Sequence, residues 1–236
     1  AMGIWKSKVR FIGAGAIGIA AIWTLITLIK PIIEGMKISV QSMNSSSSER
    51  ELHRTDTDMS TKSVLGVFAV ILVGLVFTFW DFVSAVPISA GLMWTLVIVG
   101  VVVALLIGFF VAAACGYMAG LIGTSASPIS GIGILATIIS SLVVYFIASE
   151  NNLFATEAGV QFATAMAIFM TSVVIAIASI SNDNLQDLKT GQLVGATPWR
   201  QQIALLLGSV AGAVAIAPVL NLLYQAYGFT GALPRA

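Results

Sequence analysis

Long apolar segments alternate with short polar ones along this chain. A membrane-spanning helix needs about 20 mostly apolar residues, and about six segments meet that requirement. They cover residues 9–29, 63–86, 91–118, a stretch that ends near 148, 158–181 and 203–227. The two-residue alternation of a transmembrane β-barrel strand does not occur in them. The pattern therefore predicts an all-α membrane protein, a polytopic helical bundle of about six spans.

Two polar segments interrupt the apolar pattern. Residues 35–62 contain the run QSMNSSSSERELHRTDTDMSTK, whose serines are typical of a flexible loop in water. They include His53, the only histidine of the sequence, which we interpret as a solvated loop residue. Residues 182–202 are the second polar segment and are also expected to be a loop. The whole chain, residues 1–236, is thus predicted to be one transmembrane bundle with an extramembrane linker at 35–62.

Composition supports a protein whose surface faces lipid. Hydrophobic residues make up 58% of the chain and charged residues only 9%, with a mean hydropathy of +1.01. A soluble domain usually has about 25% charged residues. The net charge of +1 argues against a nucleic-acid-binding protein, which needs a concentrated basic surface. The single cysteine, Cys115, excludes an internal disulfide.

The sequence holds no motif of a membrane-bound enzyme. Neither GxxxxGK[ST] nor HExxH occurs in it. No lysine lies in the interior of an apolar span, and the only histidine is in the linker. We therefore expect no enzymatic activity, no cofactor and no metal site.

The segment 120–133, GLIGTSASPISGIG, is uncharged but rich in glycine, serine and proline. Pro128 removes a backbone donor, and glycines such as Gly123 weaken any helix around it. The segment also carries the hydroxyls of Thr124, Ser125, Ser127 and Ser130. Transporters use broken or re-entrant helices of this kind to bind substrate near the middle of the membrane. The alternative is an ordinary turn between two helices, and the sequence leaves both interpretations open.

Asp81, in FTFWDFVS, is the one carboxylate within a strongly apolar segment. A charge at the bilayer centre costs at least about 2.5 kcal/mol. One interpretation is a residue that couples protons or contacts substrate. The other is an interfacial residue at a helix end, which we favour because Pro87 follows closely.

The run SNDNLQDLKTGQ follows the fifth apolar segment directly. Its candidate pathway residues are Asn182, Asp183, Gln186, Asp187 and Lys189. On a continuing helix, Asp183 and Asp187 would lie on one face. The run is interpreted either as a solvated loop or as the mouth of a transport pathway.

These motifs together resemble the oligopeptide transporter family. GYMAGLIGTSASPISGIGI, residues 116–134, is similar to the glycine- and serine-rich signature of that family. ISNDNLQDLKTGQLVGATPWRQQ, residues 180–202, resembles its Asn–Asp and Gln–Asp–Lys–Thr–Gly stretch. VRFIGAGAIGIAAIWTLITLIKPIIEG, near the start, is similar to a span of bacterial members. The resemblance covers most of the chain apart from the serine-rich linker.

The resemblance implies a secondary transporter, a symporter that takes up oligopeptides together with protons across the bacterial inner (plasma) membrane. One branch of the family carries metal chelates such as siderophore-like complexes, and no residue of this chain separates the two substrates. A structural membrane subunit without a transport pathway is the alternative from another class. The distribution of Lys and Arg slightly favours a cytoplasmic location for the linker 35–62 and for residues 182–202.

Family members have many more spans than this sequence, so we expect an internal fragment of a longer permease. Its expected partners are the lipid bilayer, the remaining helices of the parent transporter, protons, and a small peptide or chelate. We expect no nucleic acid among them, and no transport by the segment alone.

Overall fold

The computed structural model describes residues 4–44 and 54–228, and no strand occurs in these ranges. The long helices are α2 (Arg10–Asn44), α3 (Thr61–Ser84), α4 (Ala90–Leu121), α5 (Ile129–Glu150), α6 (Glu157–Leu193) and α7 (Pro198–Tyr227). A π-helical turn, η1 (Trp5–Val9), precedes them, and three 3₁₀ turns lie between them, η2 (Arg54–Asp56), η3 (Thr124–Ala126) and η4 (Leu153–Ala155). Within the described ranges, six helices are long and apolar enough to cross a membrane. The predicted all-α membrane fold with about six helices of spanning length is therefore confirmed.

Two helices continue beyond the apolar segments that predict them. α2 runs to Asn44, well into the segment expected to be a linker from residue 35. α6 runs to Leu193, so the loop expected over 182–202 is wrong for most of its length, and only residues 194–197 separate α6 from α7. Hydropathy marks where a helix leaves the apolar region. It does not mark where the helix ends, because a helix with polar side chains continues in water.

The chain divides into two compact units. The first comprises residues 1–50 and 60–189, and the second comprises 51–59 and 190–236. Almost all of α6 belongs to the first unit, and its last turn, from Thr190, belongs to the second. The described part of the 35–62 segment is likewise shared between the two units.

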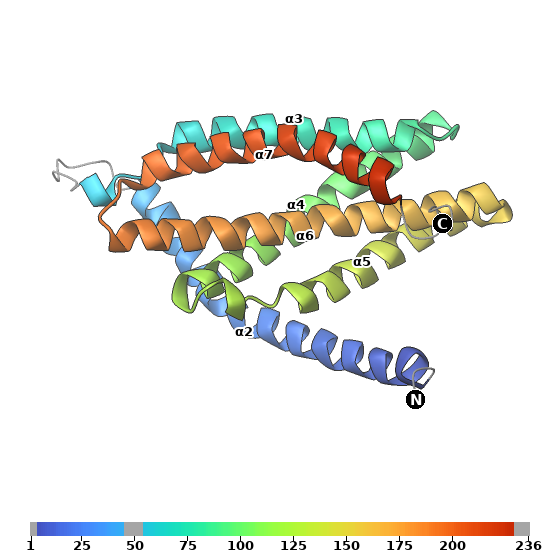
Figure 1. Ribbon diagram of the computed structural model, residues 1–236, viewed down its shortest axis with the longest axis horizontal. Helices are drawn as coiled ribbons and strands as arrows, with labels where there is room; N and C mark the ends of the chain where they lie inside the picture. The colour runs from blue at the N-terminus through green and yellow to red at the C-terminus, as the bar shows by residue number, and fades with distance from the viewer. Residues whose placement is uncertain (1–3, 45–53, 229–236) are drawn as a thin grey trace. The chain divides into compact units, whose positions relative to one another are not determined.

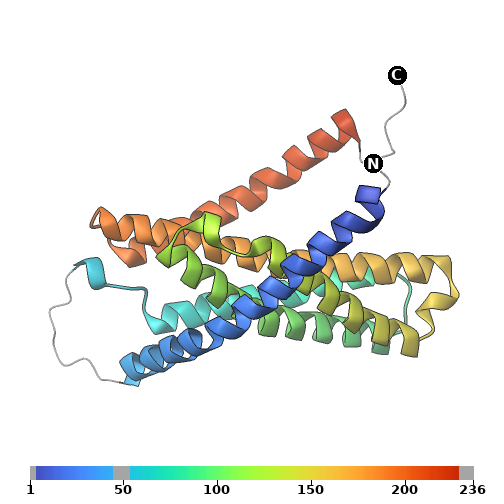
Figure 2. The same ribbon diagram turned by 90° about the horizontal axis from the view of Figure 1, so that it is seen from below.

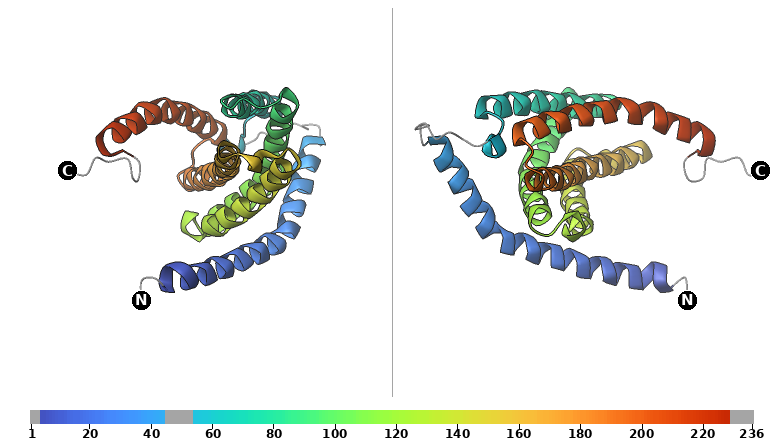
Figure 3. Two further views of the ribbon diagram at one scale, coloured as in Figure 1. Left: turned by 90° about the vertical axis from the view of Figure 1, so that its right-hand side faces the viewer. Right: turned by 60° about the vertical axis from the view of Figure 1, so that its left-hand side comes forward.

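α4 is the central helix of the first unit. It packs along α3, to which the short turn 85–89 connects it, and it also contacts α5 (Figure 1). α2 crosses α5 obliquely and touches α4 more weakly (Figure 2). α2 is bent along its length and contains Pro31, whose missing N–H and ring interrupt helical hydrogen bonding (Figure 3). Ser60 and Ser89 cap the first turns of α3 and α4 with their side-chain oxygens.

Two apolar clusters form the core of this unit. The larger one joins α3 and α4 to the end of α5 and the first half of α6. In it, the Phe169 ring stacks on Phe82 with centroids 4.3 Å apart and meets Phe79 edge-on at 5.1 Å. The smaller cluster joins the last turns of α4 to the start of α5 and the middle of α6, around Cys115 and Val174. Burial of both clusters fixes α4 between its neighbours.

Glycines on α4 let neighbouring helices approach closely. A Cβ atom on Gly100 would lie 2.5 Å from the Phe79 ring of α3. A Cβ atom on Gly108 would lie 2.7 Å from Ile177 of α6. Small residues serve this purpose between membrane helices, where dispersion contacts rather than expulsion of water drive packing.

In the second unit, residues 54–59 pair with the turn between α6 and α7. The Arg54 guanidinium donates to the Gly195 carbonyl at 3.3 Å, and the Trp199 amide donates to the Thr57 carbonyl at 3.2 Å. The Met59 amide donates to Gln202 Oε1 at 3.0 Å. Residues 54–59 therefore lie beside the turn that precedes α7 and the first turn of α7.

Candidate functional site

The predicted Gly/Ser/Pro interruption is a break of seven residues, Ile122–Pro128, between α4 and α5. Gly123 has a φ of 115°, a region that favours glycine, and turns the chain away from the end of α4. The short η3 turn follows, and the Ser127 amide donates to the Thr124 carbonyl at 3.2 Å. Pro128 then starts α5, because its carbonyl accepts the Ile132 amide at 2.9 Å.

After the break the chain folds back along α4. The Ser127 hydroxyl lies 3.3 Å from the carbonyl oxygen of Cys115, which is six residues before the end of α4 at Leu121. Six residues correspond to about 9 Å of helix, so α5 starts beside the last turns of α4 rather than beyond them. α5 has 22 residues. That makes it about 33 Å long, close to the hydrocarbon thickness of about 30 Å. The break thus lies at one end of a full-length span, which favours a folded-back turn over a helix broken near the midplane.

Ser127 and Asn182, two of the predicted site residues, meet at this point. The Ser127 hydroxyl hydrogen-bonds to the Asn182 side-chain amide, and Asn182 is only 3% exposed. One hydroxyl proton cannot serve both Asn182 Oδ1 and the Cys115 carbonyl. If the Asn182 amide is rotated by half a turn, its N–H donates to Ser127 Oγ and the Ser127 proton goes to Cys115. In that arrangement both contacts of Ser127 are hydrogen bonds, so Ser127 links the break to both α4 and α6.

A second polar contact lies one residue away on α6. The Ser181 hydroxyl donates to the Ala112 carbonyl of α4 at 2.7 Å. Gly116 faces the same helix, and a Cβ atom there would lie 3.0 Å from Ser181 Oγ and 3.2 Å from Leu185. The polar groups at this end of the unit therefore bind helix to helix. They are packed against α4 and do not line either of the hollows described below.

The other predicted residues of α6 point outward. Asp183, Gln186, Asp187 and Lys189 are all exposed on its polar extension. Since α6 is a continuous helix here, the two carboxylates lie on one face, as their spacing predicts. Asn184 differs from them, because its Oδ1 atom is buried without a hydrogen-bond partner among the described residues. Of the remaining residues near the break, Thr124 is half-buried, and Ser125 and Ser130 are exposed.

Asp81 is remote from these residues. It is exposed, three residues before the end of α3 at Ser84, whose hydroxyl donates to the Asp81 carbonyl at 2.9 Å. Its neighbour Phe79 packs on Gly100, which lies fifteen residues before Cys115 on α4. Fifteen residues correspond to about 22 Å of helix. Asp81 therefore lies at a helix end, far from the Ser127–Asn182 contact.

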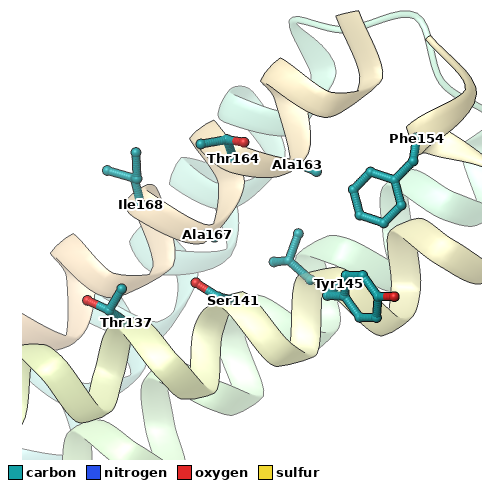
Figure 4. Close-up of a pocket in the computed structure, with 9 residues that line it drawn as sticks. Thr137, Ser141, Tyr145, Phe154, Ala163, Thr164, Ala167 and Ile168 are labelled. Atoms are coloured by element: carbon teal, nitrogen blue, oxygen red, sulfur yellow. The ribbon is translucent and has the colours of Figure 1, made fainter. Parts of the chain in front are cut away.

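Two hollows between α5 and α6 contain polar residues that sequence reasoning missed. The first has a volume of about 230 Å³, and Thr137, Ser141 and Tyr145 of α5 and Thr164 of α6 face it (Figure 4). The second, of about 470 Å³, is lined by six residues of α5 between 129 and 138, including Ser130, and by one residue of α6, and it shares Thr137 with the first. A sequence signal exists, since hydroxyl residues at 130, 137, 141 and 145 fall on one face of a helix.

Within residues 4–44 and 54–228, no group of three His, Cys, Asp or Glu side chains could hold a metal ion.

The family described as OPT oligopeptide transporter protein matches residues 1–236. The chain belongs to this family. It is 54% identical over 235 residues to a "Putative oligopeptide transporter" of Haemophilus influenzae, a match that spans all of this chain and 37% of that relative. No solved structure matches the chain.

OPT membership confirms the resemblance seen in the 116–134 and 180–202 motifs. Members of this family are transporters and not enzymes, as the sequence predicts. Together with six helices of spanning length in the described ranges, it identifies an integral membrane protein.

Proposed function

We propose that this chain is a segment of a proton-coupled oligopeptide uptake permease of the bacterial inner membrane. The observation that carries the proposal is the family match over the whole chain, together with 54% identity to a relative whose name describes oligopeptide transport. The segment spans 37% of that relative, so further helices of the same protein complete the pathway.

The surface of the segment supports the need for further helices. Only 6% of the span that includes α3 is buried. Lipid or neighbouring helices must cover its apolar faces. Reconstituted by itself, the segment is expected to give no peptide uptake, and proton-driven uptake by the isolated segment would contradict this.

Ser127 and Asn182 hold the start of α5 against α4 and α6, and we assign them a positioning role. Asp183 and Asp187 are exposed on the extension of α6, as are Gln186 and Lys189. We assign these four residues to the mouth of the pathway. An acidic mouth attracts the positive amino terminus of a peptide and provides sites for protons. The linker and the turn after α6 are placed on the cytoplasmic side.

The test is an uptake assay on the complete protein in proteoliposomes, with a labelled tripeptide and an imposed pH gradient, inside alkaline. Uptake should follow the gradient and collapse when a protonophore is added. Asp183→Asn and Asp187→Asn should lower it. A ferric chelate offered in place of the peptide should not be taken up. Transport of the chelate but not of the peptide would overturn the substrate assignment, and uptake that ignores the gradient would overturn the coupling.

A further inference from the structure

One face of α5 carries a row of hydroxyl side chains that opens onto the two hollows between α5 and α6. Ser130 lines one hollow, Ser141 and Tyr145 line the other, and Thr137 lines both. The facing positions on α6 include Ala163 and Ala167, whose side chains are too small to fill the space (Figure 4). The two hollows together form what we call the α5–α6 groove.

Two of the groove hydroxyls, Ser130 and Ser141, differ from most others in the helices. Thr137 and Thr164, which also line the groove, donate to the carbonyl four residues earlier at 2.7 and 2.8 Å. Thr78, Thr95 and Ser172, for example, each donate to the carbonyl four residues earlier, at 2.7 to 2.9 Å. Because this bond satisfies the hydroxyl within its own helix, Ser and Thr can face lipid at little cost in free energy. Ser141 and Ser130 make no such bond in the described part of the chain. Ser140, next to Ser141, is fully buried, and its hydroxyl has no partner among the described residues.

The position of Ser141 along α5 decides what its unpaired hydroxyl costs in free energy. Ser141 lies twelve residues after the start of α5 at Ile129 and nine before its end at Glu150. These separations correspond to about 18 Å and about 14 Å, so Ser141 is near the middle of the span. A polar group without a partner costs free energy in hydrocarbon and costs little against water. The groove is therefore better suited to water and polar solute than to acyl chains.

No ionisable side chain other than Tyr145 lines either hollow. Hydroxyls donate and accept hydrogen bonds without charge, which matches the amide N–H and C=O groups of a peptide main chain. Two volumes of about 230 and about 470 Å³ hold many waters at about 30 Å³ each.

We propose that the α5–α6 groove is a hydrated wall of the transport path, along which the uncharged main chain of the peptide substrate passes. This inference rests on the proposed function, because it specifies which surface of the segment the peptide meets. The charged ends of the peptide are bound by groups outside the groove.

The experiment is cysteine labelling of the complete protein in proteoliposomes, in a background where all native cysteines, including the buried Cys115, are replaced. Ser141→Cys is compared with Leu142→Cys, which lies at the same depth, is 51% exposed and does not line the groove. The probe is a membrane-impermeant cationic methanethiosulfonate. A second pair, Thr137→Cys and Ile139→Cys, repeats the comparison one turn away.

Because the reaction needs a hydrated thiolate, Ser141→Cys should react at least about tenfold faster than Leu142→Cys. An excess of unlabelled tripeptide should slow the reaction. Equal rates at both positions, or no reaction at either groove position, would show a groove filled by lipid or by another helix and would overturn the proposal. Rapid labelling that tripeptide does not slow would overturn the substrate part of it. Labelling does not depend on uptake, so absence of peptide uptake contradicts the proposed function separately.

Discussion

The contact between Ser127 and Asn182 gives the most direct test of how the break is held. Ser127→Ala removes the hydroxyl that bonds to the Asn182 amide and lies 3.3 Å from the Cys115 carbonyl. The Asn182 amide stays buried, since its residue is only 3% exposed. We therefore expect Ser127→Ala to lower the free energy of unfolding, because it removes the bonds of Ser127 to Asn182 and to the Cys115 carbonyl.

Two estimates bound the magnitude. Leaving a buried polar group without a partner costs about 1–3 kcal/mol in proteins generally. Interhelical hydrogen bonds in membrane proteins contribute less, about 0.6 kcal/mol on average and about 1.7 at most, because the unfolded chain in the membrane also finds partners. The second estimate applies here, so Ser127→Ala should cost about 1 kcal/mol, and the upper limit should not exceed about 2.

The assay is a double-mutant cycle on the complete protein, with unfolding by increasing mole fraction of denaturing detergent. Asn182→Leu keeps the branching of the side chain at Cγ and removes its polar groups. Once Leu is present, Ser127→Ala should remove only the bond to the Cys115 carbonyl. The cycle should therefore give a coupling energy between Ser127 and Asn182 of about 0.6–1.7 kcal/mol. Ser125→Ala, an exposed hydroxyl of the same break, is the control and should change stability by less than about 0.5 kcal/mol. A coupling energy of zero, or an equal effect at Ser125, would refute the assignment.

Three other outcomes follow from the packing and the backbone. Gly100→Val should destabilise the protein by about 1–3 kcal/mol, because its Cβ would lie 2.5 Å from the Phe79 ring. In the same unfolding assay Gly74→Ala, with nothing within 4 Å, should not destabilise it. Gly123→Ala should cost about 1–3 kcal/mol, since φ of 115° disfavours any side chain; a stability equal to that of wild type would contradict this. Asp81→Asn should leave peptide uptake and its pH dependence unchanged, and a loss of proton coupling would place this carboxylate in the pathway after all.

The position of the break between α4 and α5 is predictable from the sequence, but its geometry is not. Pro128 and the surrounding glycines predict an interruption, and the structure has one from Ile122 to Pro128. The same residues are compatible with a re-entrant stretch or with a turn. The choice depends on where α5 starts relative to α4, and that is set by contacts of Ser127 with residues far away in the sequence.

In the polar run SNDNLQDLKTGQ after the fifth span, composition predicts the wrong secondary structure. Its amides and carboxylates predict a loop, yet the helix continues through them to Leu193. Composition alone treats Asn182 and Asp183 as equivalent polar residues. In the structure the first is buried against the break and the second is exposed, because successive helical residues point about 100° apart.

The sequence by itself determined the class of this protein. Segments of about 20 apolar residues with almost no charge can satisfy their backbone in a bilayer only as helices, and this follows from composition and length. Tertiary structure decided which polar groups matter. Ser127 and Asn182 are 55 residues apart and meet only because α6 packs beside α4. The hydroxyls of α5 line a hollow only because small α6 side chains face them. Such pairings depend on how helices pack, which the periodicity of each segment does not encode.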